Sequence, residues 1–227
     1  MIQPAARPTA MNRKSSTFAI LIKMRVFLAI EFPNDVLRQM ETLSRDLMAK
    51  IPDPQHMIRW VKPGQHHLTL KFIGECPDAA LAGLKEAMDQ AAHRHGPFSL
   101  GFRKLGSFKS GLSLRVLWLG TEDGSEAAKI LASDLEEACQ AAAFPRDERP
   151  YHPHLTLARS KGPLPASILD KIFPAVNQKT IGPAVIEKLS LIQSILTPRG
   201  PRYTTLYRAP LHSGEASRGT MASSSVS

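Results

Sequence analysis

Two identical tetrapeptides hold the residue types in this chain that are best suited to chemistry. His-Leu-Thr-Leu occurs at residues 67–70 and again at 154–157, each time within a segment that has the pattern of a strand. Because alternate side chains of a strand point to opposite faces, His67 and Thr69 share one face, and His154 and Thr156 share the matching face. The leucines then face the core, and two histidines and two threonines can line one cleft.

These side chains suit phosphoryl chemistry. Two imidazoles can serve as general base and general acid near neutral pH, and two hydroxyls can donate hydrogen bonds to phosphate oxygens. One His-x-Thr segment alone would indicate an ordinary half-exposed strand, but two copies on matching faces favour a site. Zinc binding is disfavoured because no nearby Asp, Glu or Cys completes a typical ligand set, so we predict no metal and no cofactor.

The elements that must position these motifs alternate between strands and helices. An apolar stripe of Leu37, Met40, Leu43 and Leu47 predicts the first helix, and Asp78 can cap the second. We expect strands at 25–32, 67–73, 98–105, 112–119, 154–159, 184–196 and 202–209, with further helices at 125–143 and near 165–173. Residues 106–111 should form the turn of one hairpin, and 184–209 should form a closing hairpin. This pattern predicts an α+β protein with antiparallel sheets.

Composition bounds the class of protein and its partners. The 227 residues are 43% hydrophobic, which is enough for a real core in one domain or in two small lobes. The formal charge of +9 and the pI near 9.8 suit an anionic partner such as nucleic acid, although part of the excess lies in the expected tails. We expect a monomer, since nothing indicates an obligate partner chain.

The ends of the chain and its cysteines suggest where the folded domain lies and works. Residues 1–23 are rich in Pro, Ala, Ser and basic residues, and 212–227 form a Ser-rich tail, so we expect both to be disordered around a two-lobed domain at 24–211. Only Cys76 and Cys139 are present, which excludes a disulfide framework and favours a reducing cytoplasm. The apolar stretches are short, so we predict neither a membrane span nor export.

With the flanks of both motifs included, the sequence resembles the two-histidine phosphoesterases, specifically the branch of RNA 2′,3′-cyclic phosphodiesterases and 2′-5′ RNA ligases. The resemblance spans about residues 24–210. The matching segments are 24–30 (MRVFLAI), 59–63 (RWVKP), 66–75 (HHLTLKFIGE), 115–120 (RVLWLG) and 152–159 (HPHLTLAR).

The resemblance implies a bilobal α+β fold with pseudo-two-fold symmetry, in which each lobe contributes one His-x-Thr strand to a central groove. It implies hydrolysis of a 2′,3′-cyclic phosphate at an RNA 3′ end to a 2′-phosphate, without a metal. By this resemblance His67 and His154 are the catalytic pair, and Thr69 and Thr156 hold the phosphate. Arg159 is a further phosphate ligand in the family pattern, although strict alternation would turn it away from Thr156 unless the strand bulges.

Further residues are candidates for contacts with RNA. Phe27 and Tyr203 could each stack on a base, although a packed aromatic is as reasonable an interpretation. His152 shares the face of His154 and could touch the substrate, or it could serve only in the backbone before Pro153. His66 should point away from His67.

Positive charges could guide RNA to the site through phosphate contacts. Lys71 should lie on the polar face with Thr69, while Phe72 should share the leucine face. Lys104, Lys109, Arg199 and Arg202 stand in or beside expected turns. Trp60 and Trp118 are expected in the core or between lobes.

Three alternative functions remain open. Ligation to form a 2′-5′ bond is the reverse reaction and needs the same groups. Hydrolysis of 2′-5′ oligonucleotides is another possibility. A non-catalytic RNA-binding module is disfavoured because binding needs no matched acid and base. We favour His154 as base and His67 as acid, although the two motifs are so similar that the sequence hardly distinguishes the two roles.

Overall fold

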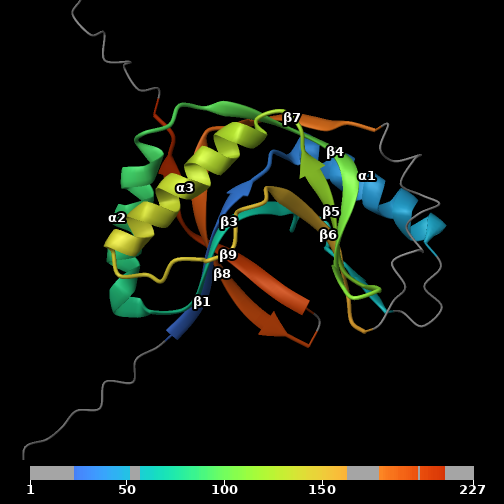
Figure 1. The fold of residues 1–227 in the computed structure, drawn as a ribbon, viewed down its shortest axis with the longest axis horizontal. Helices are drawn as coiled ribbons and strands as arrows, with labels where there is room; N and C mark the ends of the chain where they lie inside the picture. Colours follow the sequence, from blue (N-terminus) through green and yellow to red (C-terminus); the bar gives the residue numbers. More distant parts are fainter. Residues whose placement is uncertain (1–22, 52–56, 163–178, 199, 213–227) are drawn as a thin grey trace, which may run out of the picture.

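Two antiparallel sheets and three α helices make up the part of the chain that the computed structural model describes, residues 23–51, 57–162, 179–198 and 200–212 (Figure 1). The predicted α+β class with two antiparallel sheets is confirmed. Strand β1 begins one residue before the expected domain start. The expected tails lie almost wholly outside the described residues, as does the helix expected near 165–173.

The two sheets place their motif strands in matching positions. Sheet A has the order β3 (His67–Pro77), β1 (Lys23–Glu31), β8 (Lys188–Thr197) and β9 (Gly200–Pro210). Sheet B has the order β2 (Ile58–Trp60), β6 (His154–Ser160), β5 (Ser113–Thr121), β4 (Phe98–Ser110) and β7 (Ile181–Ile186). If β2 is set aside, each sheet runs from a motif strand through three further strands, as an arrangement of two related lobes requires.

The helices cover the sheets with the apolar faces that the sequence predicts. In α1 (Asn34–Lys50) the stripe of Met40, Leu43 and Leu47 is buried, and this helix contacts β7. Helices α2 (Leu81–Ala92) and α3 (Ser125–Ala141) pack against each other and lie against strands of sheet A (Figure 1). The prediction that Asp78 caps the second helix was wrong, because Asp78 opens a short 3₁₀ turn, Asp78–Ala80, and the N-cap residue of α2 is Ala80. None of the described helices has the length and apolar character needed to cross a membrane.

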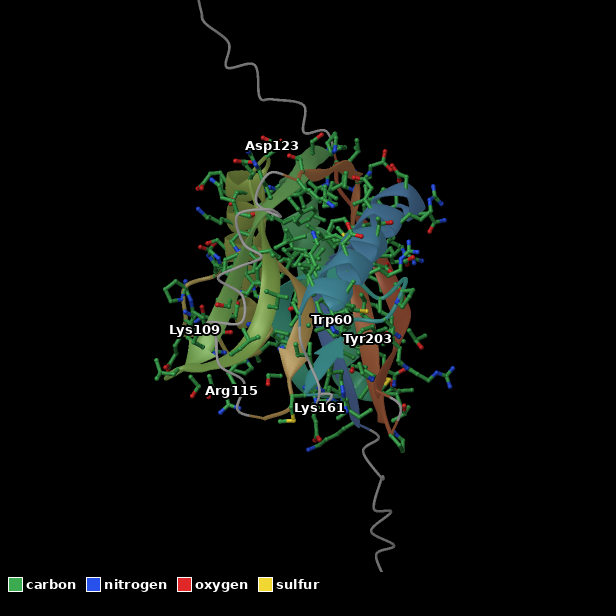
Figure 2. The ribbon with its side chains drawn as sticks, turned by 90° about the vertical axis from the view of Figure 1, so that its right-hand side faces the viewer. Trp60, Lys109, Arg115, Asp123, Lys161 and Tyr203 are labelled. Carbon is green, nitrogen blue, oxygen red and sulfur yellow. The ribbon has the colours of Figure 1, made fainter. Side chains whose placement is uncertain are left out.

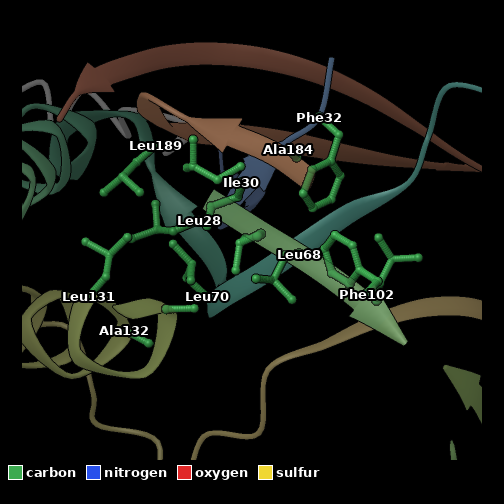
Figure 3. Close-up of a cluster of buried hydrophobic side chains, with 14 of the residues drawn as sticks. Leu28, Ile30, Phe32, Leu68, Leu70, Phe102, Leu131, Ala132, Ala184 and Leu189 are labelled. Atoms are coloured by element: carbon green, nitrogen blue, oxygen red, sulfur yellow. The ribbon is translucent and has the colours of Figure 1, made fainter. Parts of the chain in front are cut away.

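The leucines of both motifs lie in one core that joins the sheets and helices. Leu68, Leu70, Leu155 and Leu157 are all buried. Figure 3 shows Leu68 and Leu70 among side chains from β1, β4 and α3, including Leu28, Ile30, Phe102 and Leu131. Full burial of an aliphatic side chain stabilises a fold by about 1.5–3 kcal/mol. The core therefore fixes which face of each motif strand is left for His and Thr.

The first hairpin is longer than predicted. Strand β4 continues to Ser110, so the turn is only Gly111-Leu112, and Gly111 has φ +58. The prediction that the turn begins at Gly106 was wrong, because this glycine serves another purpose. A Cβ at Gly106 would overlap the ring of Trp118 on the neighbouring strand. The glycine thus makes room for an indole that lies across β4.

The closing segment also differs from its prediction. Residues 184–196 form not one strand but the end of β7 and most of β8, which belong to different sheets and are separated by Glu187. Two strands separated by one residue have the same apolar pattern as one long strand, so periodicity alone could not separate them. The hairpin of β8 and β9 itself is confirmed.

Candidate functional site

A β-bulge interrupts the first motif strand at its fourth motif residue. Thr69 pairs with Ala29 of β1, but Lys71 pairs with the next residue, Leu28, which leaves Leu70 unmatched. Such an extra residue breaks the alternation of faces along a strand. Leu70 and Lys71 are therefore both turned inward and buried.

The second motif strand has the same bulge at the equivalent position. Thr156 pairs with Trp118 of β5, whereas Ala158 pairs with Leu117, which leaves Leu157 unmatched. Leu157 and Ala158 are consecutive buried residues, as in β3. The two copies of the tetrapeptide thus share an irregularity as well as a sequence.

The bulges decide where the fifth residue after each histidine lies. Arg159 returns to the face of His154 and Thr156, which removes the objection that alternation raised against a role in the site. Its counterpart on β3 is Phe72, which is 61% exposed and has its ring 6.1 Å from that of Phe27. The predictions that Phe72 shares the leucine face and that Lys71 lies on the polar face were both wrong, because they assumed unbroken alternation.

Each motif histidine is held in the same way by the backbone two residues before it. Nδ1 of His67 lies 2.9 Å from the carbonyl oxygen of Gln65, and Nδ1 of His154 lies 2.7 Å from that of His152. A carbonyl oxygen can only accept, so we assign the ring proton of each neutral imidazole to Nδ1. This leaves Nε2, on the far side of each ring, available to a substrate.

Burial and one shared charge act on both imidazoles. Burial lowers the pKa of His67 and of His154 below the usual range, while the hydrogen bond to the backbone carbonyl opposes this in each case. The positive charge of Arg159 lowers the pKa of both rings further. Since His67 belongs to sheet A and Arg159 to sheet B, the guanidinium lies close enough to both lobes to act on both histidines.

The two histidines differ in their other charged neighbours. The carboxylate of Glu31, on the strand beside His67, raises the pKa of His67. The ring of His152 lowers the pKa of His154. Glu31 is held in place by Ser190 Oγ at 2.6 Å, by Thr205 Oγ1 at 3.0 Å and by a guanidinium from β9. These charged neighbours favour a proton on His67 over one on His154, whereas burial, the largest cause of the lowered pKa of each ring, disfavours the charged form of both.

Aromatic rings surround His67 in sheet A. The ring centroid of Phe27 lies 4.9 Å from that of His67, and the ring of Tyr203 lies 5.1 Å away, almost perpendicular at 87°. Phe27 and Tyr203 also contact each other at 5.4 Å. The structure thus brings both predicted aromatic candidates to the first motif.

A second aromatic group surrounds His154 in sheet B. Phe108 lies 4.9 Å from His154 at 85°, and Trp118 lies 5.0 Å from His152 and 6.1 Å from His154. The rings of His152 and His154 are nearly parallel at 6.2 Å. The sequence reasoning missed Phe108, which it placed in a turn, and left Trp118 in the core or between lobes. Gly106 was the available signal, because a glycine inside a strand marks a close approach.

The remaining predicted residues separate into structural and exposed ones. His66 is 3% exposed on the face opposite His67, as predicted, and burial lowers its pKa to about 4. Lys104 pairs with Glu122 at 3.8 Å. Figure 2 shows Lys109 at the left edge of the molecule, away from Trp60 and Tyr203. Arg199 lies outside the described residues. Among the described residues no three His, Cys, Asp or Glu side chains converge on a possible metal position.

Comparison with known proteins identifies the class of protein to which this chain belongs. Residues 59–195 match the family model described as the 2′-5′ RNA ligase superfamily, and the chain belongs to this superfamily of two-histidine phosphoesterases. Over most of its length its homologues are RNA 2′,3′-cyclic phosphodiesterases.

Two of these relatives are archaeal. The RNA 2′,3′-cyclic phosphodiesterase of Methanothermobacter thermautotrophicus is 32% identical over 185 residues, which cover 82% of this chain and 97% of that protein. The enzyme of the same name from Aeropyrum pernix is 32% identical over 150 residues, covering 66% of this chain and 84% of that protein.

Solved structures agree with the fold. The protein TT0787 of Thermus thermophilus superposes with a TM-score of 0.66 at 28% identity, covering 83% of this chain and 98% of that one. LigT of E. coli in its apo form gives a TM-score of 0.63 at 25% identity, with 83% and 98% covered.

Proposed function

We propose that this protein hydrolyses 2′,3′-cyclic phosphate ends of RNA to 2′-phosphates without a metal, and that His67 and His154 are its acid and base. The observation that carries the proposal is the matched setting of the two imidazoles. In each ring Nδ1 is hydrogen-bonded to a backbone carbonyl oxygen and Nε2 is available, and the positive charge of Arg159 lowers the pKa of both rings. A module that only bound RNA would need positive charge but no such pair.

The charged neighbours of the two rings support one assignment of the proton transfers. Nε2 of neutral His154 takes a proton from water as the water oxygen forms a bond to phosphorus. His67, as imidazolium, gives its proton to the departing 3′ oxygen when the bond between that oxygen and phosphorus breaks. Glu31 favours the charged form of His67, and His152 disfavours that of His154. The anionic phosphate itself further favours the imidazolium, because an opposite charge stabilises the charged form.

The other polar groups act on the phosphate. Thr69 and Thr156 lie on the histidine face of their strands and donate hydrogen bonds to the non-bridging oxygens. Arg159 adds a charge-assisted contact that strengthens as negative charge develops. Tyr203 and His152 lie beside the two histidines, where they contact the nucleosides. Phe27 is only 4% exposed and packs against the ring of His67, as the alternative of a packed aromatic predicts.

The setting of the reaction belongs to the same proposal. Both cysteines are buried and free of disulfide bonds, which fits our proposal that a monomeric enzyme works in the reducing cytoplasm. The formal charge of +9 suits an RNA substrate.

The test is to follow the product of a short RNA that ends in a 2′,3′-cyclic phosphate by phosphorus NMR. The expected product is predominantly the 2′-phosphate, and its formation should continue in EDTA. RNA ending in a linear 3′-phosphate is the control and should be unchanged. A predominant 3′-phosphate product would contradict the orientation that we propose, and activity that EDTA abolishes and zinc restores would contradict the metal-free mechanism.

A further inference from the structure

One loop joins α3 to the second motif strand and also touches the first motif strand. It comprises residues 142–153, and its penultimate residue is His152, whose carbonyl oxygen lies 2.7 Å from the ring of His154. Whatever fixes this loop against β3 therefore also fixes one histidine relative to the other.

The end of the loop is bonded directly to the first motif. The hydroxyl of Tyr151 donates to the carbonyl oxygen of Thr69 at 3.0 Å. Strand β3 is the edge of sheet A, so backbone groups on its open side lack a partner strand. Tyr151 is half-buried and packs against the core, and burial raises its pKa above the usual range, so its hydroxyl keeps the proton that it donates.

The start of the loop is tied to the same strand through a buried ion pair. Nζ of Lys71 lies 2.6 Å from Oε1 of Glu136 on α3 and 2.9 Å from the carbonyl oxygen of Pro145. The same carboxylate oxygen accepts the backbone N–H of Asp147 at 2.7 Å. The bulge at Leu70 makes this possible, because it turns Lys71 from the site face to the interior. Two consecutive parts of the loop are thus attached to β3, both within four residues of His67.

We propose that Tyr151 is a positioning residue that fixes the second His-x-Thr strand relative to the first. The ion pair of Lys71 with Glu136 and its hydrogen bond to Pro145 support the same contact. The connection runs from Thr69 of the first motif through Tyr151 to His152 and on to His154 of the second. The kinetic test of this inference rests on the proposed hydrolysis, whereas its titration test does not.

The variant that isolates the bond is Tyr151→Phe, which keeps the ring in the core and removes only the hydroxyl. We expect kcat on the cyclic phosphate to fall about ten- to a hundredfold, since a misplacement near 1 Å can cost about a hundredfold, while KM stays within about twofold. Tyr207→Phe is the matched control. It removes a hydroxyl that binds Asp89 on α2, away from both motifs, and should leave kcat unchanged.

A titration of the histidines by NMR gives an independent reading. Arg159 and His154 share a strand, so their interaction does not depend on how the lobes are set, whereas that of Arg159 with His67 does. In Tyr151→Phe we expect the pKa of His67 to rise as the guanidinium draws away, with Glu31 still raising it, while the pKa of His154, whose Arg159 neighbour lies on its own strand, should move less. Thermal unfolding should remain close to that of the wild type.

The outcomes are separable. If the wild-type protein does not hydrolyse the cyclic phosphate, the proposed function fails, and the titration alone decides the role of Tyr151. If the wild type is active, an unchanged kcat or an unchanged pKa of His67 in Tyr151→Phe overturns the proposal. A loss of activity that only accompanies a lowered unfolding temperature also overturns it, because that result describes a purely structural residue.

Discussion

Replacing Arg159 by methionine removes one charge that acts on both lobes. A hydrogen bond to a charged group contributes about 1.5–3 kcal/mol, and each 1.36 kcal/mol is a factor of ten in rate, so kcat/KM should fall about ten- to two-hundredfold. The pH profile should move as well. Arg159 lowers the pKa of both His67 and His154, so its loss lets both pKa values rise. Both limbs of the bell-shaped dependence of kcat/KM on pH should therefore shift to higher pH.

Two further variants separate charge from geometry. Arg159→Lys keeps the positive charge but loses the planar fork, so it should lower kcat/KM while leaving the pH profile close to that of the wild type. Arg94→Met, at an exposed position beyond α2, changes the net charge equally and should alter neither. An Arg159→Met enzyme with wild-type kcat/KM, or with limbs that move to lower pH, would show that Arg159 does not act on the two imidazoles as we argue.

Three other changes should have distinct effects. His67→Ala and His154→Ala should each reduce kcat by about 10²–10⁴-fold, with a double variant little worse than either single one, because the two act as a unit; a loss under tenfold would exclude that residue as acid or base. Lys71→Met should lower the free energy of unfolding by about 1–3 kcal/mol, measured in urea, because it removes the cation from the Glu136 carboxylate, which is 14% exposed and keeps only the N–H of Asp147 among the bonds described above. Gly106→Ala should destabilise by about 1–3 kcal/mol and also slow turnover, since its Cβ displaces Trp118; a fully active, equally stable variant would contradict the close approach.

Local pattern was sufficient to predict most of the elements. The helix stripe around Met40 and the leucine faces of both motifs depend on periodicity within a single segment, and the structure confirms them. The splitting of 184–196 at Glu187 was not predictable in the same way, because it depends on which sheet each half joins. That choice is made by partners far away in the chain.

The faces of the candidate site residues were predicted where side chains follow simple alternation and missed where they do not. His67, Thr69, His154 and Thr156 precede the bulges, so their faces followed from spacing alone. Phe72 and Arg159 follow the bulges, and the sequence of the repeated tetrapeptide does not indicate that its fourth residue is the extra residue of a bulge. Phe108 was missed for a related reason, since Gly106 was interpreted as a turn former and not as space for an indole.

The bulges also explain how two identical motifs come to make an asymmetric site. In both strands the fifth residue after the histidine returns to the site face. The residue at this position differs between the lobes, because it is the exposed Phe72 in one and Arg159 in the other. A cyclic phosphate carries a single negative charge, and one guanidinium that acts on both imidazoles is sufficient to pair with it. A second arginine at position 72 would lower the pKa of His67 further and oppose the proton that an acid must carry. In our proposal the apolar ring of Phe72 adds no charge that would oppose the effect of Glu31 on His67, and this difference between the lobes supports His67 as the acid and His154 as the base.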